Sequence, residues 1–168
     1  MTDHPMDADI IARAAAALDA CRKAGLRATT AESCTGGLIV GALTEIAGSS
    51  DVVGRGFVTY SNEAKAEMLG VSETTLANDG AVSEATVRQM TAGALRAAGA
   101  DADIAVAVSG VAGPGGGSPE KPVGTVWLAV ERKGRPGHAE RQLFSGDRAA
   151  VRAKTVMRAL DLIIEAAE

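Results

Sequence analysis

A continuous apolar run near the middle of the chain limits the possible folds more than any other feature. Residues 104–109 read Ile-Ala-Val-Ala-Val-Ser and have the length of one β-strand. A strand without polar alternation is buried on both faces, which is typical of parallel strands covered by helices on each side. The run therefore predicts an α/β fold, a three-layer α/β/α sandwich whose sheet is mixed and partly parallel.

Apolar spacing and the residues that begin and end helices predict the remaining secondary structure. Ser61, Ser72, Ser83 and Asp147 are suited to cap helix N-termini, and Gly25 is suited to end the first helix. Helices are expected over residues 10–24, 38–47, 62–69, 73–78, 84–98 and 148–164. Strands are expected over residues 26–30, 52–60, 104–109, 123–130 and 138–144, the last two joined as an antiparallel hairpin through the turn at 133–137.

The length of 168 residues corresponds to one domain of ordinary size. Hydrophobic residues make up 46% and charged residues 23% of the chain, a balance typical of a protein with a packed core. No internal repeat, second core or linker is visible in the sequence. We therefore expect a single domain over residues 1–168, with residues 1–6 forming a loose tail.

Charge and composition argue against nucleic-acid and membrane partners. The net charge is −4 and aromatic residues make up 2%, whereas a nucleic-acid-binding surface needs basic groups and aromatic rings. No apolar run of about 18 residues could span a bilayer and no secretion signal opens the chain, so we expect a cytoplasmic protein. Cys21, Cys34, His4 and His138 form neither a disulfide framework nor a zinc-binding pattern, so we expect a reducing compartment and no metal site.

The segment Thr29–Gly37 ends one expected strand and opens the next expected helix. Ser33 and Thr35 stand at this junction together with Gly36 and Gly37. The first backbone N–H groups of a helix lack partners within it and carry partial positive charge, so they can bind an anion or stabilise a developing oxyanion. Ser, Thr and Gly are also ordinary helix caps, and this alternative remains open.

A second unusual segment begins where the apolar run ends. Residues 109–122 are rich in Gly and Pro. Consecutive glycines let backbone N–H groups converge on an anion, although a flexible surface loop has the same composition. The segment lacks the closing Gly-Lys-Ser/Thr of a P-loop, and no G-x-G-x-x-G fingerprint follows a strand, so neither standard nucleotide-binding motif is present.

Elimination of the common hydrolytic chemistries leaves a serine and a lysine. A Ser-His-Asp triad needs an imidazole beside the serine, but His4 lies in the tail and His138 in the expected hairpin. Cys34 could be a nucleophile if the helix N-terminus lowered its pKa, although a small buried cysteine fits the same position. Ser33 activated by a neutral Lys65 remains.

Lys65 needs an unusual environment to act as a base. A lysine titrates near ~10.4 in water, so a pKa of about 7.5 requires a shift of about three units, or about 4 kcal/mol, which burial can supply. Tyr60 precedes the helix that bears Lys65 and could relay a proton between the amine and Ser33, while the backbone amides of residues 35–37 would face the oxyanion. A solvated surface lysine is the alternative, because spacing alone does not bring Lys65 to Ser33.

Two arginines, Arg148 and Arg152, lie in the first two turns of the last expected helix. A positive charge gains nothing from the helix dipole at that end. These arginines are therefore either solvated or partner-facing, or they bind an anionic substrate, for which a subunit boundary is one place.

Several sequence blocks, in one order, resemble the CinA carboxy-terminal domain family and its stand-alone (PncC-like) nicotinamide-nucleotide amidohydrolases. These blocks are Ala31-Glu32-Ser33-Cys34-Thr35-Gly36-Gly37, the segment Gly56 to Lys65 with Leu69-Gly70-Val71, Gly80-Ala81-Val82-Ser83, the segment Ser109 to Gly117, the segment Lys121 to Val126, and Phe144-Ser145-Gly146-Asp147-Arg148. The similarity extends from about Ile10 to Ala166. It implies an α/β/α fold.

The resemblance also implies hydrolysis of nicotinamide mononucleotide to nicotinate mononucleotide and ammonia, in pyridine-nucleotide salvage. Ser33 is then the nucleophile, Lys65 the base and Tyr60 an assisting residue, and no metal or organic cofactor takes part. Contacts with the nucleotide are expected from the following residues: Gly110, Ala112, Gly113 and Arg148.

The family also suggests a homodimer or larger homo-oligomer. Larger family members carry an amino-terminal domain that acts on ADP-ribose, and we expect no such activity from these residues. Two other functions fit the same residues: a non-catalytic nucleotide-binding module of the same fold, and an amidohydrolase that acts on another small amide.

Overall fold

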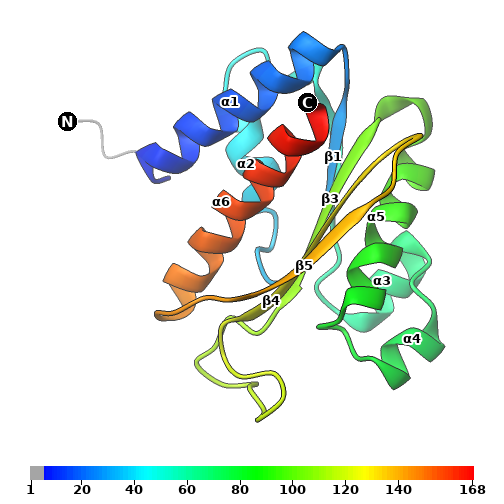
Figure 1. Ribbon diagram of the computed structural model, residues 1–168, viewed down its shortest axis with the longest axis vertical. Helices are drawn as coiled ribbons and strands as arrows, with labels where there is room; N and C mark the ends of the chain where they lie inside the picture. Colours follow the sequence, from blue (N-terminus) through cyan, green and yellow to red (C-terminus); the bar gives the residue numbers. More distant parts are fainter. Residues whose placement is uncertain (1–5) are drawn as a thin grey trace.

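A five-stranded mixed sheet lies between two layers of helices in the computed structural model, which describes residues 6–168 (Figure 1). The strand order is β2-β1-β3-β4-β5. The strands are β1 (Ala28–Glu32), β2 (Val53–Val58), β3 (Ile104–Gly110), β4 (Thr125–Arg132) and β5 (His138–Leu143). Strand β1 runs parallel to both β2 and β3, whereas β4 is antiparallel to β3 and to β5. The predicted α/β class and partly parallel sheet are confirmed.

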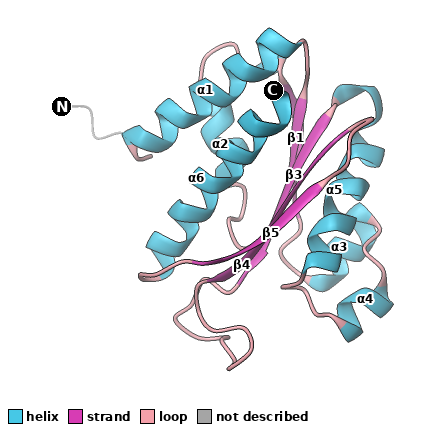
Figure 2. Ribbon diagram, in the orientation of Figure 1, coloured by secondary structure: helices cyan, strands magenta, loops and turns pink. Residues whose placement is uncertain are grey.

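Each face of the sheet carries its own helices, as Figure 2 shows with the sheet edge-on between them. One layer holds α1 (Ala8–Ala24), α2 (Leu38–Glu45) and α6 (Arg148–Ala167). The other holds α3 (Asn62–Leu69), α4 (Glu73–Asn78) and α5 (Glu84–Ala98). This arrangement confirms the predicted three-layer sandwich.

The two faces of the sheet differ in the size of their side chains. Ile104, Val106 and Val108 of β3 belong to the core cluster under α1, α2 and α6. Ala105 and Ala107, which alternate with them, belong to the cluster under α5. The apolar run at 104–109 is thus buried on both faces as predicted, with branched residues on one side and alanines on the other.

Local sequence signals explain where most helices begin and end. The side chains predicted to cap helix N-termini do so: Ser61, Ser72, Ser83 and Asp147 each accept a hydrogen bond from the backbone three residues later.

No helix within residues 6–168 is long and apolar enough to cross a membrane.

Two predicted boundaries at the start of the chain need correction. The first strand begins at Ala28 instead of residue 26, because the Leu26 N–H donates to the Cys21 carbonyl and completes the end of α1. Met6 packs against the core, so the expected loose tail does not include it. Residues 1–5 lie outside the described residues.

Helix α3 is held close to α5 by a glycine. A Cβ atom at Gly93 of α5 would lie 1.9 Å from the backbone oxygen of Leu69, the last residue of α3. No side chain fits there, so the two helices touch through their backbones. The position of α3, and of every side chain on it, therefore depends on Gly93.

We expect Gly93→Ala to lower the free energy of unfolding by about 2–3 kcal/mol, because the added methyl group must push α3 away from α5. Urea denaturation measures the change. Gly41→Ala is the matched control, since a Cβ at this helical glycine meets nothing within 4 Å. The control should be neutral or stabilising by up to about 1 kcal/mol. Equal stability of the two variants would contradict the close-contact explanation.

Candidate active site

A serine and a lysine from two different elements meet at the carboxyl end of the parallel strands. Lys65 Nζ lies 3.0 Å from Ser33 Oγ. Ser33 directly follows β1, where its N–H extends the strand pairing by donating to the Val108 carbonyl. Lys65 lies in α3, just after the Ser61 cap. Both are buried, with exposed fractions of 7% for Ser33 and 1% for Lys65.

The surroundings of the Lys65 amine favour its neutral form. Burial lowers the pKa of Lys65 below its ordinary value. The amine contacts the carbonyl oxygens of Thr59 at 3.0 Å and Tyr60 at 3.3 Å, and no carboxylate of residues 6–168 pairs with it. A neutral amine that donates its two N–H groups to these carbonyls keeps one lone pair, which can accept the Ser33 hydroxyl proton.

A buried carboxylate shapes the turn that carries the serine. Glu32 is 0% exposed. Its Oε2 accepts hydrogen bonds from Thr35 Oγ1 at 2.7 Å, from the Gly37 N–H and from the Ile39 N–H, and its Oε1 accepts one from the Val40 N–H at 2.8 Å. Glu32 thus caps α2 from outside the helix, and its carboxylate neutralises the helix dipole. The sequence offered one signal for it, an acidic residue at the end of an otherwise uncharged strand.

The Glu32 cap corrects the expected oxyanion site. The Gly37 N–H donates to Glu32, and the Gly36 N–H donates to the Ser33 carbonyl at 3.0 Å, so neither amide is free for a substrate. Thr35 does not cap the helix with its hydroxyl, which instead donates to Glu32. The amides of Cys34 and Thr35 donate to no oxygen atom among residues 6–168, so this turn leaves them available.

Tyr60 also differs from the expectation. Its side chain is 63% exposed, and its hydroxyl lies 3.3 Å from Arg148 Nη2. Only its backbone carbonyl reaches the Lys65 amine. The predicted proton relay through the phenol is therefore not formed in this structure.

The serine and the lysine open into a cavity of about 190 Å³. Its lining includes these predicted site residues: Ser33, Tyr60, Lys65, Gly110, Ala112 and Arg148. Asn62 and Ser109, which the sequence analysis did not single out, also line it. Four predicted residues lie outside the lining: Thr35, Gly36, Gly37 and Gly113. A second groove of about 500 Å³ shares Ala112 and Arg148 with this cavity.

Two arginines of α6 reach the site from one side. Arg148 Nη1 donates to the Gly113 carbonyl at 2.9 Å and so ties the Gly-rich segment to α6. Arg152 donates to the carbonyls of Cys34 and Thr35, each at 3.1 Å. Neither arginine has a carboxylate partner among residues 6–168, so the site is cationic within an acidic protein.

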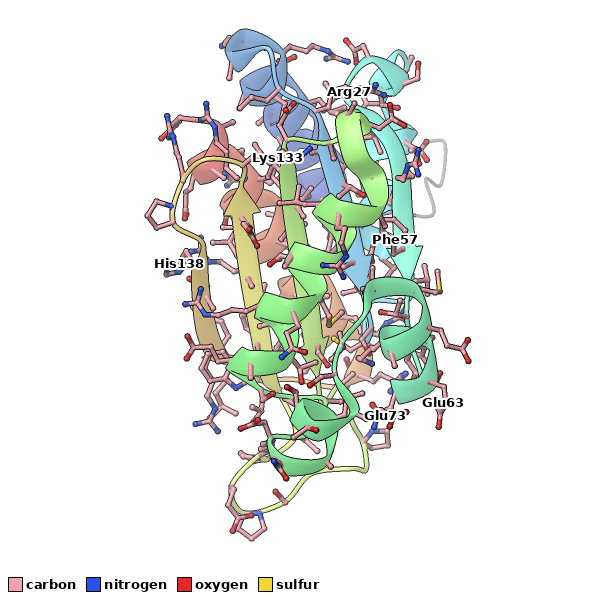
Figure 3. The ribbon with its side chains drawn as sticks, turned by 90° about the vertical axis from the view of Figure 1, so that its right-hand side faces the viewer. Arg27, Phe57, Glu63, Glu73, Lys133 and His138 are labelled. Carbon is pink, nitrogen blue, oxygen red and sulfur yellow. The ribbon has the colours of Figure 1, made fainter. Side chains whose placement is uncertain are left out.

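The alternative nucleophile and base do not fit this geometry. Burial raises the pKa of Cys34 to about 11, so its thiol stays protonated near neutral pH. His138 lies on β5, at the edge of the sheet away from α3 and its Glu63 (Figure 3), and it contacts Glu140. Within residues 6–168, no three His, Cys, Asp or Glu side chains gather where they could hold a metal ion.

We expect Glu32→Gln to lower the free energy of unfolding by roughly 3 kcal/mol. The substitution replaces one carboxylate oxygen by an amide nitrogen, which cannot accept the buried hydrogen bonds made to that oxygen, and it removes the negative charge. Urea denaturation monitored by circular dichroism tests this. Glu73→Gln is the control, since Glu73 is an exposed residue of α4 (Figure 3) and its loss should change stability by no more than about 0.5 kcal/mol. A Glu32 variant as stable as the wild type would show that the cap is dispensable.

Comparison with known proteins places this geometry in a family. Residues 11–167 match the family model described as the CinA C-terminal domain. A protein of Escherichia coli (strain K12) named nicotinamide-nucleotide amidohydrolase PncC is 56% identical over 144 residues, which cover 86% of each chain. A protein of the same name from Pseudomonas putida is 53% identical and covers 86% of this chain and 88% of its own.

Solved structures agree with these sequence relatives. The crystal structure of the competence/damage inducible protein CihA from Agrobacterium tumefaciens has a TM-score of 0.93 to this chain at 48% identity, and the match covers 98% of this chain and 99% of that one. An Escherichia coli protein of the CinA superfamily has a TM-score of 0.87 at 37% identity, covering 98% of this chain and 95% of its own. The chain belongs to the CinA C-terminal domain family.

Proposed function

We propose that the chain hydrolyses the amide of nicotinamide mononucleotide to give nicotinate mononucleotide and ammonia, a step of pyridine-nucleotide salvage. One observation carries the proposal: a buried lysine, which no carboxylate of residues 6–168 pairs with, lies 3.0 Å from the hydroxyl of a buried serine that opens into a cavity. The names of the curated relatives support the same activity and the same substrate.

In the proposed mechanism, Ser33 Oγ attacks the amide carbon while its proton passes to Lys65 Nζ. The protonated amine then gives this proton to the leaving nitrogen, so that ammonia departs and an acyl-enzyme forms. A water molecule attacks the acyl-enzyme with Lys65 again as the base, which releases the carboxylate and restores Ser33. The carbonyls of Thr59 and Tyr60 hold the amine in place through the cycle.

The tetrahedral intermediates need hydrogen-bond donors for their oxyanion. We assign this role to the backbone N–H of Cys34, which lines the cavity, because the amides of Gly36 and Gly37 are already engaged. The Cys34 amide belongs to the residue directly after the nucleophile. This amide lies in the turn that Glu32 holds through the Thr35 hydroxyl.

The size and charge of the site fit a nucleotide better than a free pyridine amide. The cavity of about 190 Å³ beside Ser33 is small, and the groove of about 500 Å³ continues from it past Ala112 and Arg148. The pyridine amide would occupy the cavity and the phosphoribosyl group the groove, where Arg148 supplies positive charge to the phosphate. We retain Tyr60 as a residue of the site, because its hydroxyl accepts a hydrogen bond from Arg148.

Ammonia release from nicotinamide mononucleotide by the purified protein tests the function. Ser33→Ala should reduce the rate to background, and Lys65→Met should lower kcat by roughly 10²–10⁴-fold because the base is lost. Lys23→Met, which removes an exposed lysine of α1, should retain full activity.

Robust turnover by either site variant would exclude the serine–lysine mechanism. Binding of the mononucleotide by the wild type without turnover would instead favour a non-catalytic binding module. Comparison of the mononucleotide with nicotinamide riboside and nicotinamide tests the substrate, and equal rates with all three would favour another small amide.

The pH dependence should report the buried amine. Only neutral Lys65 can accept the serine proton, so kcat/KM should rise with pH and reach its plateau below the ordinary lysine pKa of 10.5. The same burial lets the unfolded chain bind more protons than the folded protein between the lowered pKa and 10.5, so stability should also rise with pH across that window. A rate that falls toward alkaline pH while the protein stays folded would contradict Lys65 as the base.

A further inference from the structure

The guanidinium of Arg152 donates two hydrogen bonds to the backbone of the turn that follows Ser33, here called the nucleophile turn. Its Nε donates to the Cys34 carbonyl and its Nη2 to the Thr35 carbonyl, both at 3.1 Å. Arg152 comes from α6, more than a hundred residues further along the chain, so this contact connects the turn to a separate helix. A side chain that only filled space or met solvent would not need two aligned acceptors.

The peptide planes of the turn explain what this contact does. In a trans peptide the C=O and the N–H point to opposite sides, and the peptide between Cys34 and Thr35 is trans. Arg152 on the Cys34 carbonyl therefore directs the Thr35 N–H away from the guanidinium. The same reasoning applies to the preceding peptide, where the Gly36 N–H holds the Ser33 carbonyl and so fixes the Cys34 N–H.

The charge of Arg152 acts in the same direction. No carboxylate of residues 6–168 pairs with its guanidinium, so its positive charge is not neutralised locally. A cation bound to a carbonyl polarises that peptide and makes its N–H a stronger donor. Glu32 holds the same turn from the other end through Thr35 Oγ1 and the Gly37 N–H.

We infer that Arg152 is a positioning residue: by holding the Cys34 and Thr35 carbonyls it fixes the turn so that the Cys34 N–H, which lines the cavity, faces the oxyanion formed on Ser33. This inference rests on the proposed function for its natural substrate. It makes Arg152 distinct from Arg148, which lines the cavity and contacts Tyr60 and Gly113. Arg152 does not line the cavity beside Ser33, but it does line the neighbouring groove together with Arg148, so the kinetic test must separate positioning from phosphate binding.

Kinetics of Arg152→Gln and Arg152→Lys test the inference. We expect Arg152→Gln to lower kcat by about 10–100-fold with KM little changed, since a misdirected oxyanion donor costs less than a deleted one. Arg152→Lys keeps the charge but not the paired geometry and should be intermediate. Lys154→Gln is the control, because Lys154 lies on the same helix and its amine donates to Ser145 and not to the nucleophile turn, so it should match the wild type.

A second readout does not depend on the natural substrate. A fluorophosphonate probe phosphonylates an activated serine: Ser33 Oγ would bond to phosphorus, fluoride would leave and the proton would pass to Lys65. The phosphonyl oxygen uses the same donors as the oxyanion, so the labelling rate of Arg152→Gln should fall in parallel with kcat. Millimolar guanidinium should partly restore labelling in Arg152→Ala, in which the emptied position can accept the free cation.

The outcomes separate this inference from the proposed function. A raised KM with unchanged kcat and unchanged labelling would overturn the inference and make Arg152 a substrate-phosphate contact. Equal labelling of the wild type and Arg152→Gln would also overturn it. A wild-type protein that releases no ammonia but is labelled in an Arg152-dependent manner would refute the mononucleotide activity and support the positioning role.

Discussion

The buried carboxylate of Glu32 is the interaction on which the site depends. Four donors meet its two oxygens, and three of them are backbone amides at the start of α2. A helix N-terminus normally attracts a ligand anion, but here a side chain of the protein already occupies it. Removal of a buried charge partner costs more than the pair contributes, so the turn after β1 has little freedom. Because Ser33 belongs to that turn, its position is fixed as well.

Lys65 illustrates the opposite electrostatic situation. Burial lowers the pKa of its amine and makes the charged form costly, and no carboxylate of residues 6–168 offsets this cost. The amine contacts the carbonyls of Thr59 and Tyr60 and the hydroxyl of Ser33. The fold keeps the amine there by packing α3 directly on α5 at Gly93. Burial of Lys65 thus lowers the free energy of unfolding while it keeps the amine neutral and able to accept a proton, as expected for a catalytic base.

The sequence predicted features that depend on neighbouring residues. Ser61 and Ser83 identified helix starts because a capping hydroxyl acts within one turn, and the run at 104–109 identified a buried strand because burial needs no polar alternation. The Ser33–Lys65 contact needed the family resemblance, since it forms only when β1 and β2 pair and α3 folds back.

Other features of the site depend on contacts that no local pattern encodes. The sequence indicated that amides of residues 35–37 were free, because nothing in the spacing shows that Glu32 reaches α2 from the strand before it. The contact between the Tyr60 hydroxyl and Arg148 joins segments that are 88 residues apart in the chain. Only the folded arrangement could reveal that the Tyr60 hydroxyl does not meet the amine.

The alanines on one face of the sheet have a consequence for distance. Ala31, Ala105 and Ala107 lie under α5, whereas the opposite face carries branched residues such as Val106 and Val108. Small side chains let a helix layer approach a sheet more closely, and α3 rests on that layer through Gly93. A lysine side chain has a limited length, so the spacing between this helix layer and the sheet limits whether its amine can reach Ser33. The alanines of the sheet thus contribute to a spacing between sheet and helix layer at which the Lys65 amine contacts the Ser33 hydroxyl.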